Sequence, residues 1–154
     1  MEILVDTREK PQAIGKILRQ FDENGVKYAR SKLFVGDYMS LSNAKFVIDR
    51  KQDLQELCGN VCQQHQRFKA ELQRANDLGI KVCILCEHGG DIRSLEDVKN
   101  WINPRLTTSP KATKGTTLYK ILHTLSWNYD VDFVFCKKGE TGLKIIELLK
   151  EHGG

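Results

Sequence analysis

The most constraining feature of this sequence is a nearly continuous apolar run, Lys81–Cys86, in the middle of an otherwise polar chain. A strand that is apolar on both faces belongs in the interior of a sheet that is covered on both sides. Segments with apolar residues at helical spacing, such as Pro11–Asn24 and Thr141–Lys150, occur before and after it. The run therefore predicts an α/β fold, a three-layer mixed sheet flanked by helices.

The other periodic segments give the expected order of elements. Three strand-like runs, Val26–Leu33, Asp37–Leu41 and Lys45–Lys51, are separated by short turn-forming segments and predict an antiparallel meander. A long helical segment, Leu54–Leu78, follows and is expected to break near Gly59-Asn60. The remaining expected elements are a strand at Glu2–Val5, a short helix at Leu95–Ile102, a helix at Thr117–Trp127 and a strand at Val131–Cys136.

Composition indicates one soluble domain spanning residues 1–154. Hydrophobic residues make up 40% and charged residues 29% of the chain, which is ordinary for a globular protein. No apolar run reaches the length of a membrane span, and the first ten residues carry charges where a signal peptide would be apolar.

Five cysteines follow no secreted pattern, so we expect an intracellular protein (cytoplasm or nucleus) that is not secreted. Cys83 and Cys86 would lie on opposite faces of one strand, which favours buried thiols over a zinc site.

Two acids and a lysine form the most informative pattern. Asp49 and Lys51 are two residues apart on a predicted strand, so both side chains point from the same face, while Arg50 points from the other. The preceding strand can bring Asp37 alongside them. Asp49 and Lys51 follow the apolar run Phe46–Ile48, so they stand at the end of a buried strand rather than on an exposed, charged one.

This inventory suits phosphodiester hydrolysis. Carboxylates bind Mg²⁺ or Mn²⁺, which polarises a phosphate oxygen and activates water. A lysine orients or deprotonates the attacking water and offsets the charge that builds on the phosphate. The run Asp6-Thr7-Arg8-Glu9 supplies further acids and a base at the end of another predicted strand.

At this point the sequence resembles the nuclease domain of the XPF-type structure-specific endonucleases, a branch of the PD-(D/E)xK superfamily. The matching motifs are Val5–Glu9, Gly36–Tyr38 and Val47–Lys51, followed by Gln66-Arg67-Phe68 in a helix and a hydrophobic strand that ends in Glu87. The resemblance covers roughly residues 1–150. It implies a restriction-nuclease-like fold and a metal-dependent DNA endonuclease.

The resemblance also implies roles for individual residues. Asp6, Glu9, Asp37 and Asp49 would surround the metal, Arg50 would be the motif arginine, and Lys51 the catalytic lysine. Arg8 and Arg67 would contact phosphate or support the site.

The chain departs from the family's pattern in two places. The family usually has Glu where this chain has Asp49. Its motif also has Asp where this chain has Gln55, and Asp53 and Glu56 lie close enough to substitute.

A basic segment marks a second expected DNA contact. Between Val98 and Tyr129 there are five basic residues and no Asp or Glu. Such a segment is often a solvated surface, but it also fits a phosphate backbone. We expect Arg105, Lys111 and Lys114 to contact DNA.

The C-terminal helices predict a homodimer. The last helix is apolar over a wide arc from Leu143 to Leu149, and the Leu118–Trp127 segment has an apolar face.

Two alternatives to a DNA endonuclease stay open: an inert nuclease fold that serves as a DNA-binding or scaffolding subunit, and a nuclease that acts on RNA. We expect no helix–hairpin–helix module within these residues, so a preference for branched or flap DNA is not implied.

Overall fold

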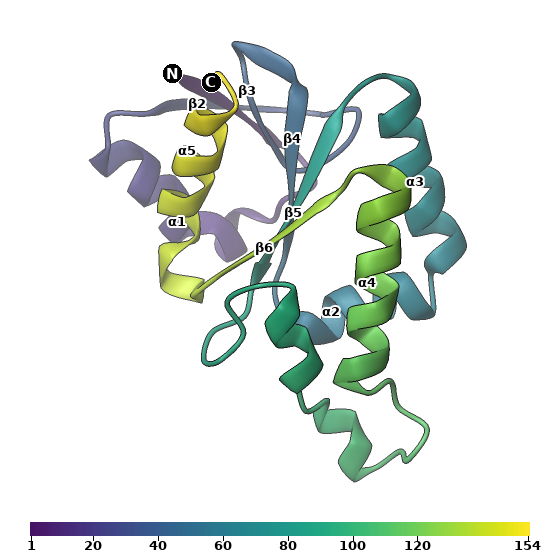
Figure 1. Ribbon diagram of the computed structural model, residues 1–154. Helices are drawn as coiled ribbons and strands as arrows, with labels where there is room; N and C mark the ends of the chain where they lie inside the picture. Colours follow the sequence, from purple (N-terminus) through teal and green to yellow (C-terminus); the bar gives the residue numbers. More distant parts are fainter.

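The computed structural model describes all residues, 1–154, and contains a single six-stranded sheet with helices on both faces (Figure 1). The strand order is β2-β1-β3-β4-β5-β6. The strands are β1 (Glu2–Asp6), β2 (Lys27–Ser31), β3 (Tyr38–Ser40), β4 (Asn43–Lys51), β5 (Lys81–Glu87) and β6 (Asp132–Cys136). The helices are α1 (Pro11–Glu23), α2 (Leu54–Cys62), α3 (His65–Asp77), α4 (Gly115–Tyr129) and α5 (Thr141–Glu151), with 3₁₀ turns η1 (Glu96–Asn100), η2 (Pro104–Thr107) and η3 (Lys138–Glu140).

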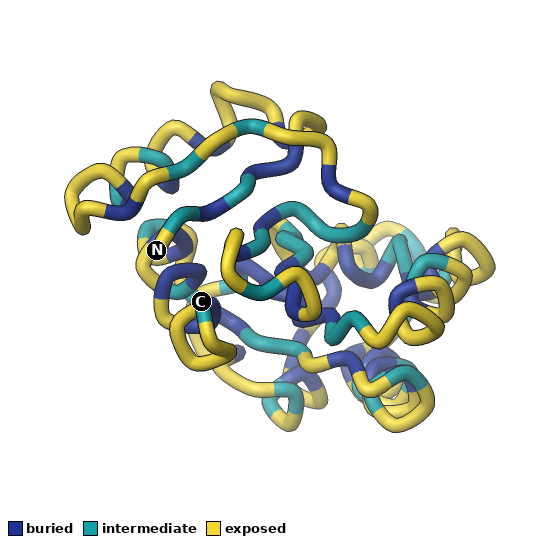
Figure 2. Tube along the Cα trace, turned by 90° about the horizontal axis from the view of Figure 1, so that it is seen from above, coloured by how far each residue is buried: buried dark blue, intermediate teal, exposed yellow.

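The apolar run that constrains the fold becomes β5, which pairs in parallel with β4 on one side and β6 on the other. Its side chains enter two separate cores. Val82, Ile84 and Cys86 pack under α2, α3 and α4, whereas Cys83 and Leu85 pack under α1 and α5. Figure 2 shows the buried positions between the layers and the exposed ones on the outer turns. The predicted three-layer α/β fold is confirmed.

The predicted three-strand meander is wrong. β2 pairs in parallel with β1, and β1 separates β2 from β3, so that only the β3–β4 hairpin is antiparallel between consecutive strands. The physical reason is α1: it connects β1 to β2 as a crossover and buries Ile14, Ile17 and Phe21 against the sheet. A crossover helix on one face favours a parallel partner.

The break in the long helical segment also lies later than expected. The segment divides at Gln63-Gln64, between α2 and α3, and Gly59 stays inside α2. A single glycine weakens a helix by only about 1 kcal/mol relative to alanine, which the packing of buried residues such as Val61 offsets.

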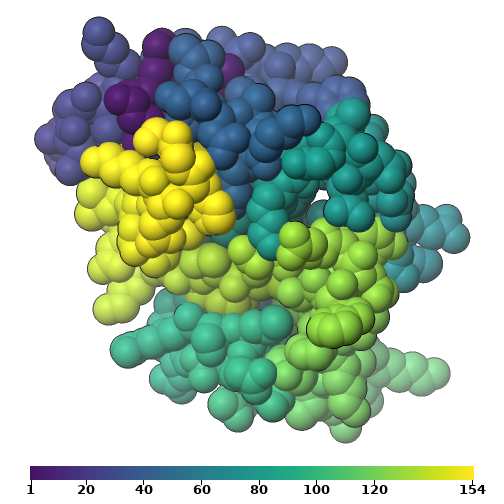
Figure 3. All heavy atoms as spheres, turned by 45° about the horizontal axis from the view of Figure 1, so that its top comes forward, coloured from purple at the N-terminus to yellow at the C-terminus, as the bar shows by residue number.

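The two C-terminal helices lie on opposite faces of the sheet. Leu118, Leu122 and Leu125 of α4 are buried in one core, and Ile145 and Leu149 of α5 are buried in the other. In Figure 3 the C-terminal helix (yellow) lies beside the N-terminal segment (purple), and both termini lie at the same end of the sheet in Figure 1. One chain therefore buries most of the apolar surface that suggested a homodimer, and the homodimer stays a prediction.

None of the helices has the length and apolar character that a bilayer crossing requires.

The sheet gathers polar residues at one edge. β1, β4 and β5 end there, at Asp6, Lys51 and Glu87, and the antiparallel β3 begins there, directly after Asp37. Four segments that are distant in sequence thus place charged side chains at a common edge.

Gly36 controls how closely the loop before β3 approaches β4. Its φ is +78°, and a Cβ at this position would lie 2.9 Å from the Cβ of Val47. Gly36→Ala should therefore combine left-handed backbone strain with overlap and cost about 2–4 kcal/mol of unfolding free energy, measured by urea denaturation. Gly25→Ala is the matched control: φ is +66° with no atom near its Cβ, so about 1 kcal/mol is expected. Equal losses in both variants would contradict the role of close packing.

Candidate active site

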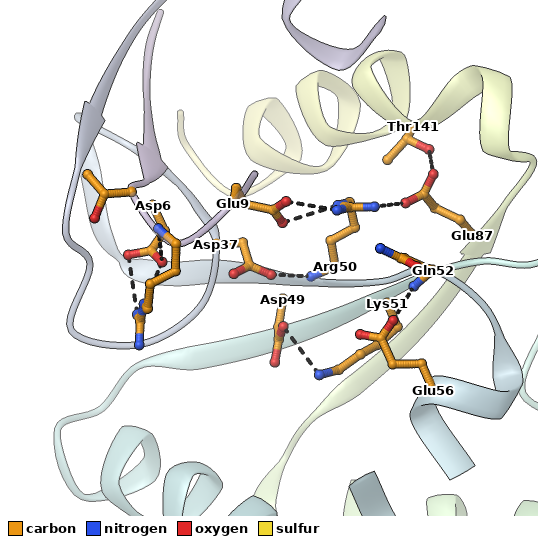
Figure 4. Close-up of polar contacts among 12 residues, drawn as sticks. Asp6, Glu9, Asp37, Asp49, Arg50, Lys51, Gln52, Glu56, Glu87 and Thr141 are labelled. Atoms are coloured by element: carbon orange, nitrogen blue, oxygen red, sulfur yellow. Dashed lines mark hydrogen bonds and ion pairs between the residues drawn. The ribbon is translucent and has the colours of Figure 1, made fainter. Parts of the chain in front are cut away.

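Asp37 and Asp49 form the centre of the polar edge (Figure 4). The backbone N–H of Asp37 donates to the carbonyl of Ile48 at 2.8 Å, and its Oδ2 accepts the backbone N–H of Arg50 at 2.8 Å. These bonds tie the start of β3 to the end of β4. Burial raises the pKa of Asp37 well above its usual range, and the nearby charge of Asp49 raises it further. The two acidic side chains therefore crowd one another at this edge.

Lys51 stands beside this pair. Its Nζ lies 3.7 Å from Oδ1 of Asp49, and its side chain is only 12% exposed. The ammonium also lies 5.8 Å from the ring centroid of Phe68 on α3. The predicted common face of Asp49 and Lys51 is confirmed, and α3 provides the apolar support that holds the lysine in place.

Arg50 points from the opposite face of β4, as expected, into a buried ion-pair network. Its Nε and Nη2 donate to Oε1 and Oε2 of Glu9 at 3.1 and 2.8 Å, and its Nη1 bonds Glu87. Thr141, the first residue of α5, donates its hydroxyl to Oε2 of Glu87 at 2.9 Å. Burial alone would lower the pKa of Arg50, but the two carboxylates raise it above its usual value.

Sequence reasoning missed the contributions of Glu87 and Thr141. Glu87 carried a signal, because an acid at the end of the most buried strand needs a partner. Thr141 carried none, since only the packing of α5 places its hydroxyl at this position.

Asp6 does not join the Asp37–Asp49 pair. It is fully buried, and its carboxylate accepts hydrogen bonds from the Arg8 side chain at 2.6 and 3.2 Å, from the Arg8 backbone at 3.1 Å and from the Leu33 N–H at 2.8 Å. Although burial acts to raise it, these bonds hold the pKa of Asp6 below its usual value. Arg8, expected to contact DNA, thus has an intramolecular partner, while its side chain stays 62% exposed.

An open hollow at the edge of the sheet is lined by Asp37, Asp49 and Lys51, and also by Glu9 and Glu56. The four predicted metal-binding acids are not gathered into one cluster, and no group of three potential metal-binding side chains occurs. Both carboxylate oxygens of Glu9 already bond Arg50. The two aspartates still fit Mg²⁺ or Mn²⁺, because Mg²⁺ is usually held by one or two carboxylates together with water and substrate oxygens.

The acids that follow Lys51 have different roles. Asp53 is the N-cap of α2 and accepts the N–H of Glu56 at 2.8 Å. Glu56 accepts the N–H of Gln52 at 3.1 Å and lines the hollow, whereas Gln55 faces another hollow beyond α2.

The remaining predicted DNA contacts lie around the hollow rather than in it. Arg67 on α3 is 80% exposed and shares a second hollow with Lys51. Arg105 and Lys111 line a third, between α2 and the segment that follows η1, and Lys114 is exposed at the start of α4. Figure 1 shows this segment beyond the sheet edge where β4 and β5 end.

The crowded carboxylates should make the metal-free protein sensitive to pH. Because folding raises the pKa of Asp37 from 3.8, its contribution to stability is complete below about pH 4 and is lost as pH rises into the alkaline range. In EDTA at pH 8, Asp37→Asn should therefore stabilise the fold by ~1–2 kcal/mol and flatten the pH dependence of Tm. Asp22→Asn, at an exposed position on α1, should change neither property. A destabilised Asp37→Asn would contradict this picture.

Comparison with known proteins agrees with the geometry. The sequence matches the ERCC4 domain over residues 5–149. XPF from Aeropyrum pernix superimposes with a TM-score of 0.71 at 19% identity, covering 99% of this chain and 65% of that chain. The same protein in complex with DNA gives 0.69 at 20% identity, with 99% and 64% covered. No curated protein gives a match.

The chain thus spans about 65% of the length of the XPF chain that it resembles. At this low identity the structural likeness establishes only the fold. The family is established by the sequence match, which extends over nearly the whole chain. The expected relationship is confirmed: this chain belongs to the ERCC4 domain family, the XPF-type nuclease domains.

Proposed function

We propose that this domain is a divalent-metal-dependent DNA endonuclease. The observation that carries the proposal is the partly desolvated Asp37–Asp49 pair beside Lys51, open to solvent through a hollow. Two adjacent carboxylates that share a single ammonium are costly in a folded protein, and such strain is typical of functional sites. An inert scaffold would be more stable without this arrangement. The presence of the arrangement therefore favours an active enzyme.

In the proposed mechanism Asp37 and Asp49 would hold Mg²⁺ or Mn²⁺, and such a cation would supply a Lewis acid that polarises the scissile phosphate and lowers the pKa of water. Lys51 offsets the negative charge that develops on the phosphate, from a position fixed by Asp49 and Phe68. Arg50 contacts no phosphate; it orients Asp37 through its backbone N–H and fixes the end of β4 through Glu9 and Glu87.

The acids around the pair divide between metal binding and support. Glu9 supports the site by holding Arg50, and Asp6 supports it by holding Arg8. Neither carboxylate is free to bind a metal, because each is already bonded to its arginine. Asp53 is committed to capping α2. We assign to Glu56, which faces the hollow, the role that the family's acid has at the position of Gln55.

DNA is the proposed partner. One of the structures with the same fold is a complex of XPF with DNA. In this chain Arg67 shares a hollow with Lys51, and Arg105, Lys111 and Lys114 extend the positive surface beyond α2. A duplex or single strand that extends from the acidic pair over these hollows would meet the cations that a phosphate backbone requires.

Cleavage should depend on the metal and on the central residues. Asp49→Asn should abolish cleavage of labelled DNA in Mg²⁺ or Mn²⁺, and Lys51→Ala should lower the rate by ~10²-fold or more while leaving DNA affinity nearly unchanged. EDTA should stop the wild type. Lys150→Ala, on an exposed position of α5, is the matched control. Normal cleavage by Asp49→Asn would refute the assignment, and an RNA substrate in the same assay tests the alternative nucleic acid.

The basic segment should contribute affinity without selectivity. A Lys111→Ala/Lys114→Ala variant should bind all DNA sequences more weakly, and the slope of log K against log [salt] should fall by about one unit per lost contact. A Lys27→Ala/Lys150→Ala variant removes the same charge from other exposed positions and should keep the wild-type slope. If both double variants have the same slope as the wild type, the segment makes no contact with DNA.

A further inference from the structure

Phe34 is an aromatic residue displayed on the surface next to the acidic pair. Its side chain is 62% exposed. The residue before it, Leu33, is buried, donates its N–H to Asp6 at 2.8 Å and accepts a hydrogen bond from Arg8 Nη2 at 3.1 Å. The backbone on this side of Phe34 is therefore anchored.

The backbone on the other side is anchored too. Gly36 packs against Val47 too closely for any Cβ, and Asp37 bonds Ile48 of β4. Between these two attachments Phe34 has no route into either core. The fold holds the ring outside, even though burying it would be favourable.

The surroundings of the ring belong to the site. Phe34 lines one hollow together with Asp37, Asp49 and Lys51, and the guanidinium of Arg74 lies 5.1 Å from the ring centroid. Arg8 lines the same hollow. Glu71 is the only other acid there, and Arg67 faces it at 3.9 Å.

We propose that an unpaired nucleobase of the substrate stacks on Phe34 while the adjacent phosphate lies at Asp37 and Asp49. This inference rests on the proposed nuclease function and adds a contact to it: Phe34 holds one unpaired base beside the cleaved bond. Aromatic rings bind bases of any sequence by stacking. Arg74 and Arg8 lie where the flanking phosphates would need cations.

A continuous duplex does not fit this arrangement equally well. Its bases are already stacked on one another, and exposing one requires unstacking and unpairing, which a pre-formed single-stranded region avoids. A protein partner is the competing occupant of Phe34. It is disfavoured because any surface that covered the ring would also cover the hollow that holds Asp37 and Asp49.

The test uses the full chain and oligonucleotides that carry 2-aminopurine at an unpaired position beside the cleavage site. Binding is measured in Ca²⁺, and cleavage in Mg²⁺ or Mn²⁺. Wild-type protein should quench the fluorescence through stacking. Phe34→Ala should lose the quenching and bind single-stranded or flap DNA about tenfold more weakly, with less than about twofold change on duplex. Phe34→Trp should restore both properties.

Trp127→Ala is the control, because this aromatic on α4 is 85% exposed; it should behave as wild type. Equal melting temperatures of the two alanine variants and the wild type show that the fold is intact.

If Phe34→Ala cleaves and quenches normally, or binds duplex and single-stranded DNA more weakly to the same extent, the inference fails and the nuclease proposal stands. If no DNA is cleaved but quenching depends on Phe34, the nuclease proposal fails and the stacking surface stands. A loss of self-association in Phe34→Ala with unchanged DNA binding would overturn the inference in favour of a protein partner.

Discussion

The guanidinium of Arg50, buried between Glu9 and Glu87, is the interaction on which the rest of the site depends. It joins the loop between β1 and α1, the end of β4 and the end of β5, and Thr141 extends the network to α5. Removing one partner of such a pair leaves a buried charge uncompensated, at a cost of about 3–5 kcal/mol. The network thus holds four separate segments of the chain at one edge of the sheet.

Each face of β4 carries one cation and two carboxylates, and the faces differ in how closely these charges are bonded. On the Arg50 face, one arginine is matched by carboxylates from two elements. On the other face, Asp37 and Asp49 share only Lys51, and the pKa of Asp37 is raised by burial and by its neighbour. The Arg50 face provides rigidity, and we propose that the other face binds a cation. This division explains how adjacent residues on one strand serve different purposes.

The loop before β3 follows the same logic on a smaller scale. Asp6 and Arg8 neutralise each other and hold Leu33, while Gly36 allows the chain to pass closely over Val47. Asp37 and Phe34 are consequently presented by a segment that is fixed at both ends. Asp6, which the sequence suggested as a metal ligand, instead positions the loop that leads to Asp37.

The sequence alone was sufficient for the layers, for most elements and for the faces of β4. The apolar run of β5 required cover on both sides, and the two-residue period of a strand put Asp49 with Lys51 and turned Arg50 away. These are local properties, so a linear pattern determines them.

Tertiary structure decided what depends on neighbours distant in sequence. The pattern of β2 does not say whether it pairs with β1 or β3; the packing of α1 does. Four acids near one edge look equivalent in the sequence. In the structure the Arg8 side chain pairs with Asp6 and the Arg50 side chain pairs with Glu9. Neither arginine side chain forms an ion pair with Asp37 or Asp49. The apolar arcs of α4 and α5 were likewise ambiguous until the sheet placed them on opposite faces. In each case the sequence determined which groups need partners, and only the packed chain determined which partners they obtain, because contacts between distant segments leave no periodic signal.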